Sequence, residues 1–118
     1  MAAYSAARPQ STYKRRPSLS RQIAGYAVSN EVWRFAVEND LILHLETAIR
    51  LVHECFPTVS EVRLLHEIDW EIEDRSWVTI ETKITGTIED ILQQYNQFTV
   101  SMVREVPSEK GGKILLSF

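Results

Sequence analysis

The sequence has little of what covalent catalysis, membrane insertion or metal binding requires. Cys55 is its only cysteine, which excludes an intrachain disulfide and a metal site built from several cysteines. No apolar run approaches the roughly 18–20 residues that cross a bilayer, and the first residues lack the apolar centre of a secretory signal. No serine stands in a nucleophile-elbow pattern, and "EKGGK" lacks the order of a phosphate-binding loop. These absences favour a cytoplasmic protein with no membrane segment, no cofactor, no metal and no enzymatic activity.

The three histidines do not form a metal-binding pattern either. His44 and His53 are nine residues apart, which is about 900° of rotation along a helix, so they do not share a face. His66 has the inward phase of a strand, and we expect a core residue whose hydrogen bonds are satisfied. Cys55 stands among apolar residues in a helical segment, which favours a small core residue over a nucleophile.

Acidic residues are absent from the start of the chain. The net charge is −3, yet residues 1–21 contain five basic residues and no acid, whereas the rest of the chain has eight basic and sixteen acidic residues. Residues 1–28 are rich in Ser, Ala, Arg and Pro and show no periodicity, so we predict a flexible tail. A phosphorylation motif at Ser18 and a targeting segment are further interpretations of this composition. The tail is the only part expected to attract nucleic acid, through basic residues that include Lys14, Arg15, Arg16 and Arg21.

Two segments have the apolar spacing of helices. The first predicts a helix over residues 31–55, capped by Ser29 or Asn30, ended before Pro57 and open to a break at Asn39–Asp40. The second follows Thr87, a predicted N-cap, and ends at Pro107. Its apolar stripe is expected to belong to the core and consists of Ile88, Ile91, Leu92, Tyr95, Phe98, Met102, Val103 and Val106.

Between the two helices the apolar period changes to two, which is typical of strands with one buried and one wet face. Residues 61–73 and 77–85 predict two strands joined by a short polar turn into an antiparallel hairpin. "KILLSF" at residues 113–118 predicts a last strand. The outward positions of the hairpin form a predicted acidic interaction face, which holds Glu67, Asp69, Glu71, Glu73, Trp77 and Glu81.

The order helix, strand, strand, helix, strand predicts an α+β fold in which helices cover one face of a three-stranded sheet. Because the last strand returns through a helix, it should lie parallel to the second strand. A chain of this length forms one domain, which we place at residues 29–118.

The hairpin register decides which outward residues meet. The inward apolar pattern requires a loop with an odd number of residues, and a loop of residues 74–76 is the predicted choice. This loop opposes Asp69 to Glu81 and gives Lys83 an acidic partner in Glu67. In this register Asp69, Glu81 and Lys83 converge on one face of the sheet.

An acid on one strand followed by Glu-x-Lys on the next resembles the restriction-endonuclease-like nucleases. The resemblance implies that Asp69 and Glu81 hold Mg²⁺ and that Lys83 helps to activate the attacking water. The chain departs from that family because two strands, not three, precede its second helix, and no proline lies near the acid. Solvation of a wet strand face accounts for the same residues without any chemistry.

A second resemblance covers residues 41–118. The runs "AIRLVHECFP", "WVTIETKITG" and "KILLSF" resemble a small uncharacterised bacterial α+β family, which implies the fold and no activity. We therefore expect a non-enzymatic interaction domain that self-associates or binds a basic protein partner through its acidic sheet face. Its own basic tail is one such partner, and a Mg²⁺-dependent nuclease is the alternative.

Overall fold

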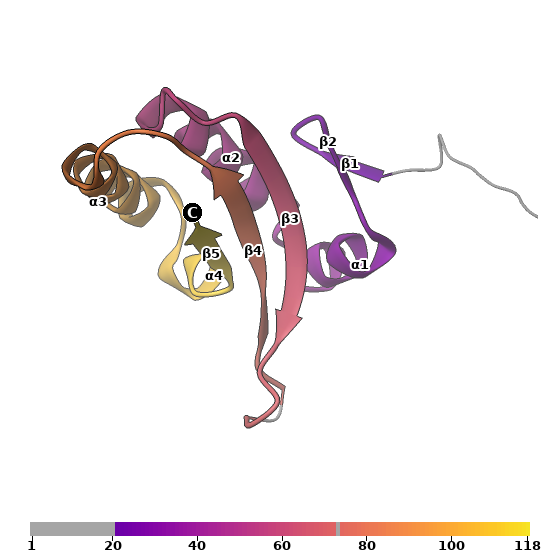
Figure 1. Cartoon of the computed structure of the whole chain (residues 1–118). Coiled ribbons are helices and arrows are strands. Elements are labelled where there is room, and N and C mark those ends of the chain that lie inside the picture. Colours follow the sequence, from indigo (N-terminus) through magenta and orange to yellow (C-terminus); the bar gives the residue numbers. More distant parts are fainter. Residues whose placement is uncertain (1–20, 73) are drawn as a thin grey trace, which may run out of the picture.

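The structure, a computed structural model, describes residues 21–72 and 74–118. Lys14, Arg15, Arg16 and Glu73, named above, lie outside the described residues. Within these ranges the fold is α+β, with four helices, a three-stranded mixed sheet and a two-stranded sheet (Figure 1). In the part of the chain that the structure describes, no helix is both long enough and apolar enough to cross a membrane.

A short hairpin precedes the first helix, where a tail was predicted. Strands β1 (Arg21–Ile23) and β2 (Tyr26–Val28) pair antiparallel. Both residues of the turn between them have positive φ, 52° at Ala24 and 85° at Gly25, which is the type I′ geometry of two-residue hairpins. Ile23 is fully buried in the core. Residues 21–28 of the predicted tail therefore form two strands, one of which contributes Ile23 to the core.

The first predicted helix forms as two helices. Helix α1 (Asn30–Glu38) begins at Ser29, whose Oγ accepts a hydrogen bond from the amide of Val32 at 3.1 Å. Helix α2 (Ile42–Cys55) follows after a break in which Asp40 has a positive φ of 56°. The cap at Ser29 and the break at Asn39–Asp40 confirm the sequence-based expectation.

The second predicted helix also forms at the expected place. Helix α3 (Ile88–Glu105) is capped by Thr87, whose Oγ1 accepts a hydrogen bond from the amide of Asp90 at 3.1 Å. It ends before Pro107, after which a four-residue helix, α4 (Ser108–Gly111), leads into the last strand. The hydroxyl cap and the proline therefore fix both ends of α3.

The three-stranded sheet has the order β3 (Glu61–Ile68), β4 (Ser76–Lys83) and β5 (Ile114–Ser117). Strand β4 pairs antiparallel with β3 and parallel with β5, as the connection through a helix predicted. Strand β5 pairs with β4 along one side only among the described strands.

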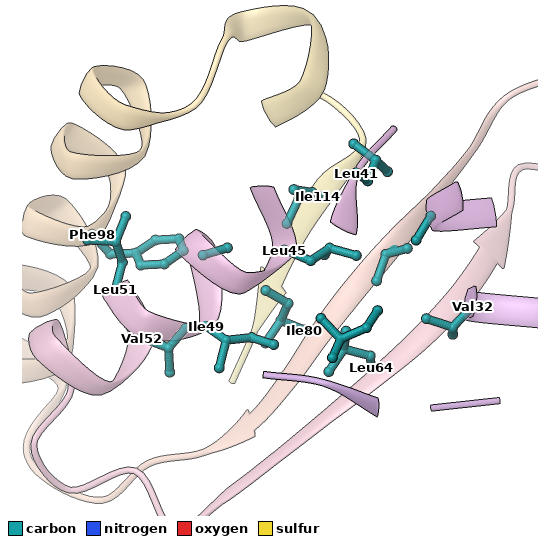
Figure 2. Packing of buried hydrophobic residues seen from close by; sticks show 14 of the residues in the cluster. Val32, Leu41, Leu45, Ile49, Leu51, Val52, Leu64, Ile80, Phe98 and Ile114 are labelled. Carbon is teal, nitrogen blue, oxygen red and sulfur yellow. The ribbon is translucent and has the colours of Figure 1, made fainter. Parts of the chain in front are cut away.

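The core lies between the sheet, α2 and α3. Figure 2 shows buried side chains of α2 that lie toward the sheet and toward α3. The sheet supplies alternate residues of its strands, as the period of two requires. The central members of the cluster are Leu45, Ile49, Val52, Leu64, Ile80, Phe98 and Ile114.

The hairpin register differs from the predicted one. The structure pairs Glu61 with Lys83 and Arg63 with Glu81, and the loop covers residues 69–75, still an odd number. The guanidinium of Arg63 donates to Glu81 Oε1 from Nε at 3.1 Å and from Nη2 at 2.6 Å. In this register two pairs of opposite charges face each other and no two acids are opposed, whereas the predicted register opposed Asp69 to Glu81. The predicted register was therefore wrong.

The apolar stripe of α3 is only partly buried, which corrects the expectation that it belongs to the core. Phe98 and Val106 are buried, and Ile91 and Met102 are half-buried. Ile88, Leu92 and Val103, by contrast, are exposed. The stripe is wider than the contact that α3 makes with the core.

Candidate functional site

The observed register separates the three residues of the nuclease hypothesis. Glu81 faces Arg63, and Asp69 lies six residues further along β3 and its loop. At the rise of a strand this is about 20 Å, whereas two ligands of one Mg²⁺ lie within about 5 Å of each other. Lys83 Nζ lies 3.9 Å from the carboxylate of Glu61 instead of Glu67. The predicted convergence of these side chains was wrong, and the geometry gives no support to a metal site built from them.

The outward face of β3 and β4 is also less acidic than predicted. Of the five residues of the predicted interaction face that the structure describes, Glu67, Trp77 and Glu81 lie on paired strand positions, and Asp69 and Glu71 lie in the loop. Glu81 is held by Arg63, as described above. The outward positions of the two strands hold three acids and two bases, so this part of the sheet is close to neutral: Glu61, Arg63, Leu65, Glu67, Trp77, Thr79, Glu81 and Lys83.

The remaining acids lie at the tip of the hairpin. We call residues 67–75 the hairpin tip; their sequence holds five acids and one base, Arg75. Figure 1 shows that the loop between β3 and β4 projects beyond the helices. The side chains of Glu67, Glu71 and Asp74 are exposed. The acidic character predicted for the sheet face therefore belongs to the hairpin tip.

Hydrogen bonds define the path of the tip. The amide of Asp69 donates to the carbonyl of Arg75 at 2.8 Å, which closes the loop just beyond the paired strands. The carboxylate of Asp69 accepts a hydrogen bond from the amide of Glu71 at 2.9 Å, as in an Asx turn. Asp74 has a positive φ of 63°, a conformation that Asp tolerates better than most residues. Asp69 thus has a structural role in the loop.

Apolar side chains stand among the carboxylates of the tip. Trp70 is 91% exposed, and Ile68 and Ile72 are about half exposed. Trp77 differs, because it is half-buried and its indole N–H donates to Thr79 Oγ1 at 3.1 Å. A fully exposed tryptophan is unusual for a residue that buries 150–250 Å² when packed. The tip therefore presents an aromatic residue in an acidic surrounding.

Two histidines lie in contacts that the sequence did not reveal. The hydroxyl of Tyr26 and Nε2 of His53 form a hydrogen bond of 2.7 Å, and this pair joins β2 to α2. His66 is half-buried, with its ring 4.6 Å from that of Phe35. Its Nε2 has no hydrogen-bond partner among the described residues. Neither contact pairs a histidine with a serine, a cysteine or a carboxylate, as a catalytic dyad or triad would.

The cysteine is not poised for reaction. Cys55 is half-buried and packs against the core, close to its predicted role. Burial, and to a smaller extent the nearby carboxylate of Glu54, raise the pKa of the Cys55 thiol. A raised pKa lowers the thiolate fraction at neutral pH and with it the reactivity.

A second surface lies at the opposite edge of the sheet from β3. Helices α3 and α4 and strand β5 enclose an apolar groove of about 400 Å³. Tyr95, Met102 and Val103 line it from α3, and Ile114 and Leu116 line it from β5. Sequence reasoning missed this groove because it assigned the whole stripe of α3 to the core.

No protein-family model, curated protein or solved structure gave a significant match to the chain.

Proposed function

We propose that this protein is a non-enzymatic interaction domain whose hairpin tip binds a basic segment of a protein partner. The observation that carries the proposal is Trp70, which is 91% exposed and stands between Asp69 and Glu71 in the loop that joins β3 to β4. Tryptophan is among the residues that most often dominate binding energy at protein interfaces. Hydration of the exposed apolar ring is unfavourable, and burial of the ring against a partner would remove this free-energy cost.

The fold places the tip where a partner can reach it. In this proposal the helices pack on one face of the sheet, and residues 29–118, together with the hairpin of β1 and β2, act as one domain. The inward residues Leu64 and Ile80 are buried, in support of this arrangement. The hairpin then extends past the helices and offers both sides of its loop to a partner.

Charge complementarity selects the kind of partner. The tip holds five acids and one base, so it attracts a basic segment and repels an acidic one. Nucleic acid is a poor partner for this surface, because its phosphates carry the same sign of charge as the tip. The chain itself contains a segment of the required chemistry, with five basic residues and no acid: Arg8, Lys14, Arg15, Arg16 and Arg21. This segment serves as the probe for the proposal, in a compartment that we propose to be the cytoplasm.

A fluorescent peptide of residues 8–21, titrated with the full chain, tests the proposal by fluorescence anisotropy. The protein should carry Gln at positions 14, 15 and 16, because its own basic segment competes at a high effective concentration. We expect saturable binding that weakens as salt is added, since surface charges attract at long range only when they are not screened.

Two controls decide where the peptide binds. Trp70→Ala should lower the affinity for the peptide. Leu43→Ala, which removes an exposed apolar side chain on α2 instead, should leave the affinity unchanged. A peptide whose basic residues are replaced by Gln should not bind. Equal affinity of the Trp70→Ala and Leu43→Ala proteins would contradict the proposed site.

A further inference from the structure

Helix α3 carries an apolar stripe that the described part of the protein leaves uncovered. Ile88, Leu92, Tyr95 and Val103, with Thr99 between the last two, recur every three or four residues, and all five are exposed. We call them the α3 stripe. This spacing places them on one side of the helix, next to the buried Phe98. It is the spacing with which helices pack against one another.

The free edge of β5 lies beside the α3 stripe. The groove of about 400 Å³ runs between α3 and β5, so the space beyond the edge of the sheet is not filled by the described residues. At one end the ring of Phe118 lies 5.6 Å from that of Tyr95, with Phe118 still 54% exposed. An unpaired backbone edge and an uncovered apolar helix thus meet at one place.

The edge has none of the features that usually prevent pairing. Residues 114–118 contain no charged residue and no proline, and four of the five are apolar. Soluble proteins generally protect such edges with Lys, Pro, a bulge or a covering element. Because none of these protects β5 among the described residues, a further strand fits this edge.

From these observations we propose that the protein forms a two-fold symmetric dimer through this edge. Strand β5 pairs antiparallel with β5 of a second copy, and the α3 stripes of the two copies pack against each other above the joined sheet. The inward side chains of the second copy's strand, Ile114 and Leu116, then fill the groove. The proposal is independent of the hairpin tip, which stays accessible at another part of the molecule.

The sequence of β5 suits pairing with itself. In antiparallel pairing about a two-fold axis, residues of the same parity face each other. With Leu116 on the axis, Ile114 faces Phe118 of the second copy and Leu115 faces Ser117 of the second copy. Apolar inward side chains therefore meet apolar inward side chains, and no two like charges are opposed.

The apolar area agrees with what a stable dimer needs. The exposed apolar residues of this surface would bury on the order of 400 Å² per copy. A standard interface buries about 800 Å² per partner, of which about 60% is apolar. The residues concerned are Ile88, Leu92, Tyr95, Val103, Leu115 and Phe118.

The two-fold axis also sets the orientation of the helices. Helix α3 connects two parallel strands, so in the proposed dimer it runs roughly antiparallel to β5, and the two copies of α3 are antiparallel to each other. Their helix dipoles then point in opposite directions, which is the favourable orientation for neighbouring helices.

Sedimentation equilibrium of the full chain, over about 1–200 μM, tests the dimer. We expect a reversible monomer–dimer equilibrium in the wild type. Val103→Glu, which places a charge in the groove, should raise the dissociation constant at least about tenfold, because the buried carboxylate would lack a partner. Val100→Glu is the matched control: Val100 is also exposed on α3 but does not line the groove, so its effect should stay within about twofold.

Further variants keep the test decisive. Leu115→Glu should act like Val103→Glu, and Leu43→Glu on α2 should act like Val100→Glu. In the wild type, amide hydrogen exchange of β5 should slow as the concentration rises, a measurement that does not depend on any variant.

Three results would overturn the inference. They are a monomer throughout the concentration range, equal effects of Val103→Glu and Val100→Glu, and exchange of the β5 amides that does not change with concentration. None of them bears on peptide binding at the hairpin tip, so the two proposals fail separately.

Discussion

Truncation of Trp70 should weaken peptide binding strongly while changing the free energy of unfolding only slightly. Because the side chain is 91% exposed, folding buries only about a tenth of it, or on the order of 20 Å². At about 25 cal/mol per Å², Trp70→Ala should lower the free energy of unfolding by about 0.5 kcal/mol. A tryptophan at the centre of an interface contributes about 2 kcal/mol or more on truncation, so the affinity for the basic peptide should fall about thirtyfold.

Two assays on the same protein samples check this separation. Urea unfolding followed by circular dichroism gives the change in stability, and the anisotropy titration gives the change in affinity. A stability loss above about 1.5 kcal/mol would show that Trp70 is packed in the folded protein, which contradicts its exposure. An unchanged affinity would show that the tip is not the binding surface.

Three further predictions concern the fold. Ile80→Ala, which empties a fully buried position in the central strand, should cost about 2–5 kcal/mol in urea unfolding, and a loss below about 1 kcal/mol would contradict the assigned core. Ser29→Ala and Thr87→Ala should each cost about 1 kcal/mol through loss of a helix cap, with Ser29→Gly and Thr87→Gly costing less. Burial raises the pKa of the Cys55 thiol, so its reaction with a disulfide reagent at pH 8 should be slower in the folded chain than in the chain unfolded in urea. The difference between the two rates should shrink as the pH rises further. Equal rates at pH 8 would contradict the raised pKa.

Local signals in the sequence located the main elements. The hydroxyl caps at Ser29 and Thr87 mark the starts of α1 and α3, because each accepts a hydrogen bond from an amide that the helix leaves unpaired. The alternation in residues 61–68 and 76–83 correctly assigned the inward side of the hairpin. The parallel placement of β5 followed from the helix that connects it to β4.

The register depended on information that periodicity does not contain. Parity allows every odd loop length, and the choice among them depends on which cross-strand pairs form. The observed pairing of Arg63 with Glu81 and Glu61 with Lys83 satisfies four charges at once. The loop of residues 69–75 that this register requires is stabilised by the backbone hydrogen bond between Asp69 and Arg75 and by the Asx turn at Asp69. A survey of all charge pairings over odd loop lengths would have favoured this register.

Two features that the sequence did not reveal, the β1–β2 hairpin and the groove beside α3, were hidden for different reasons. Residues 21–28 and the groove depend on contacts between distant parts of the chain, which short apolar patterns do not specify. The "AG" turn is a weak hairpin signal beside Asn-Gly, although Gly25 supplies one of the two positive φ angles. On α3, core and interface residues share the same spacing, so the sequence alone does not separate Phe98 from Val103.

The most direct test of the interaction-domain account is nuclear magnetic resonance of the ¹⁵N-labelled full chain, with Gln at positions 14, 15 and 16, during titration with the peptide of residues 8–21. The three tryptophans give separate indole N–H signals, and Trp33 on α1 serves as an internal reference far along the chain from the tip. The account predicts that the indole signal of Trp70 and the amide signals of residues 67–72 shift together, while that of Trp33 does not. Shifts confined to α3 and β5, or a Trp70 signal that stays in place while the peptide binds, would contradict it.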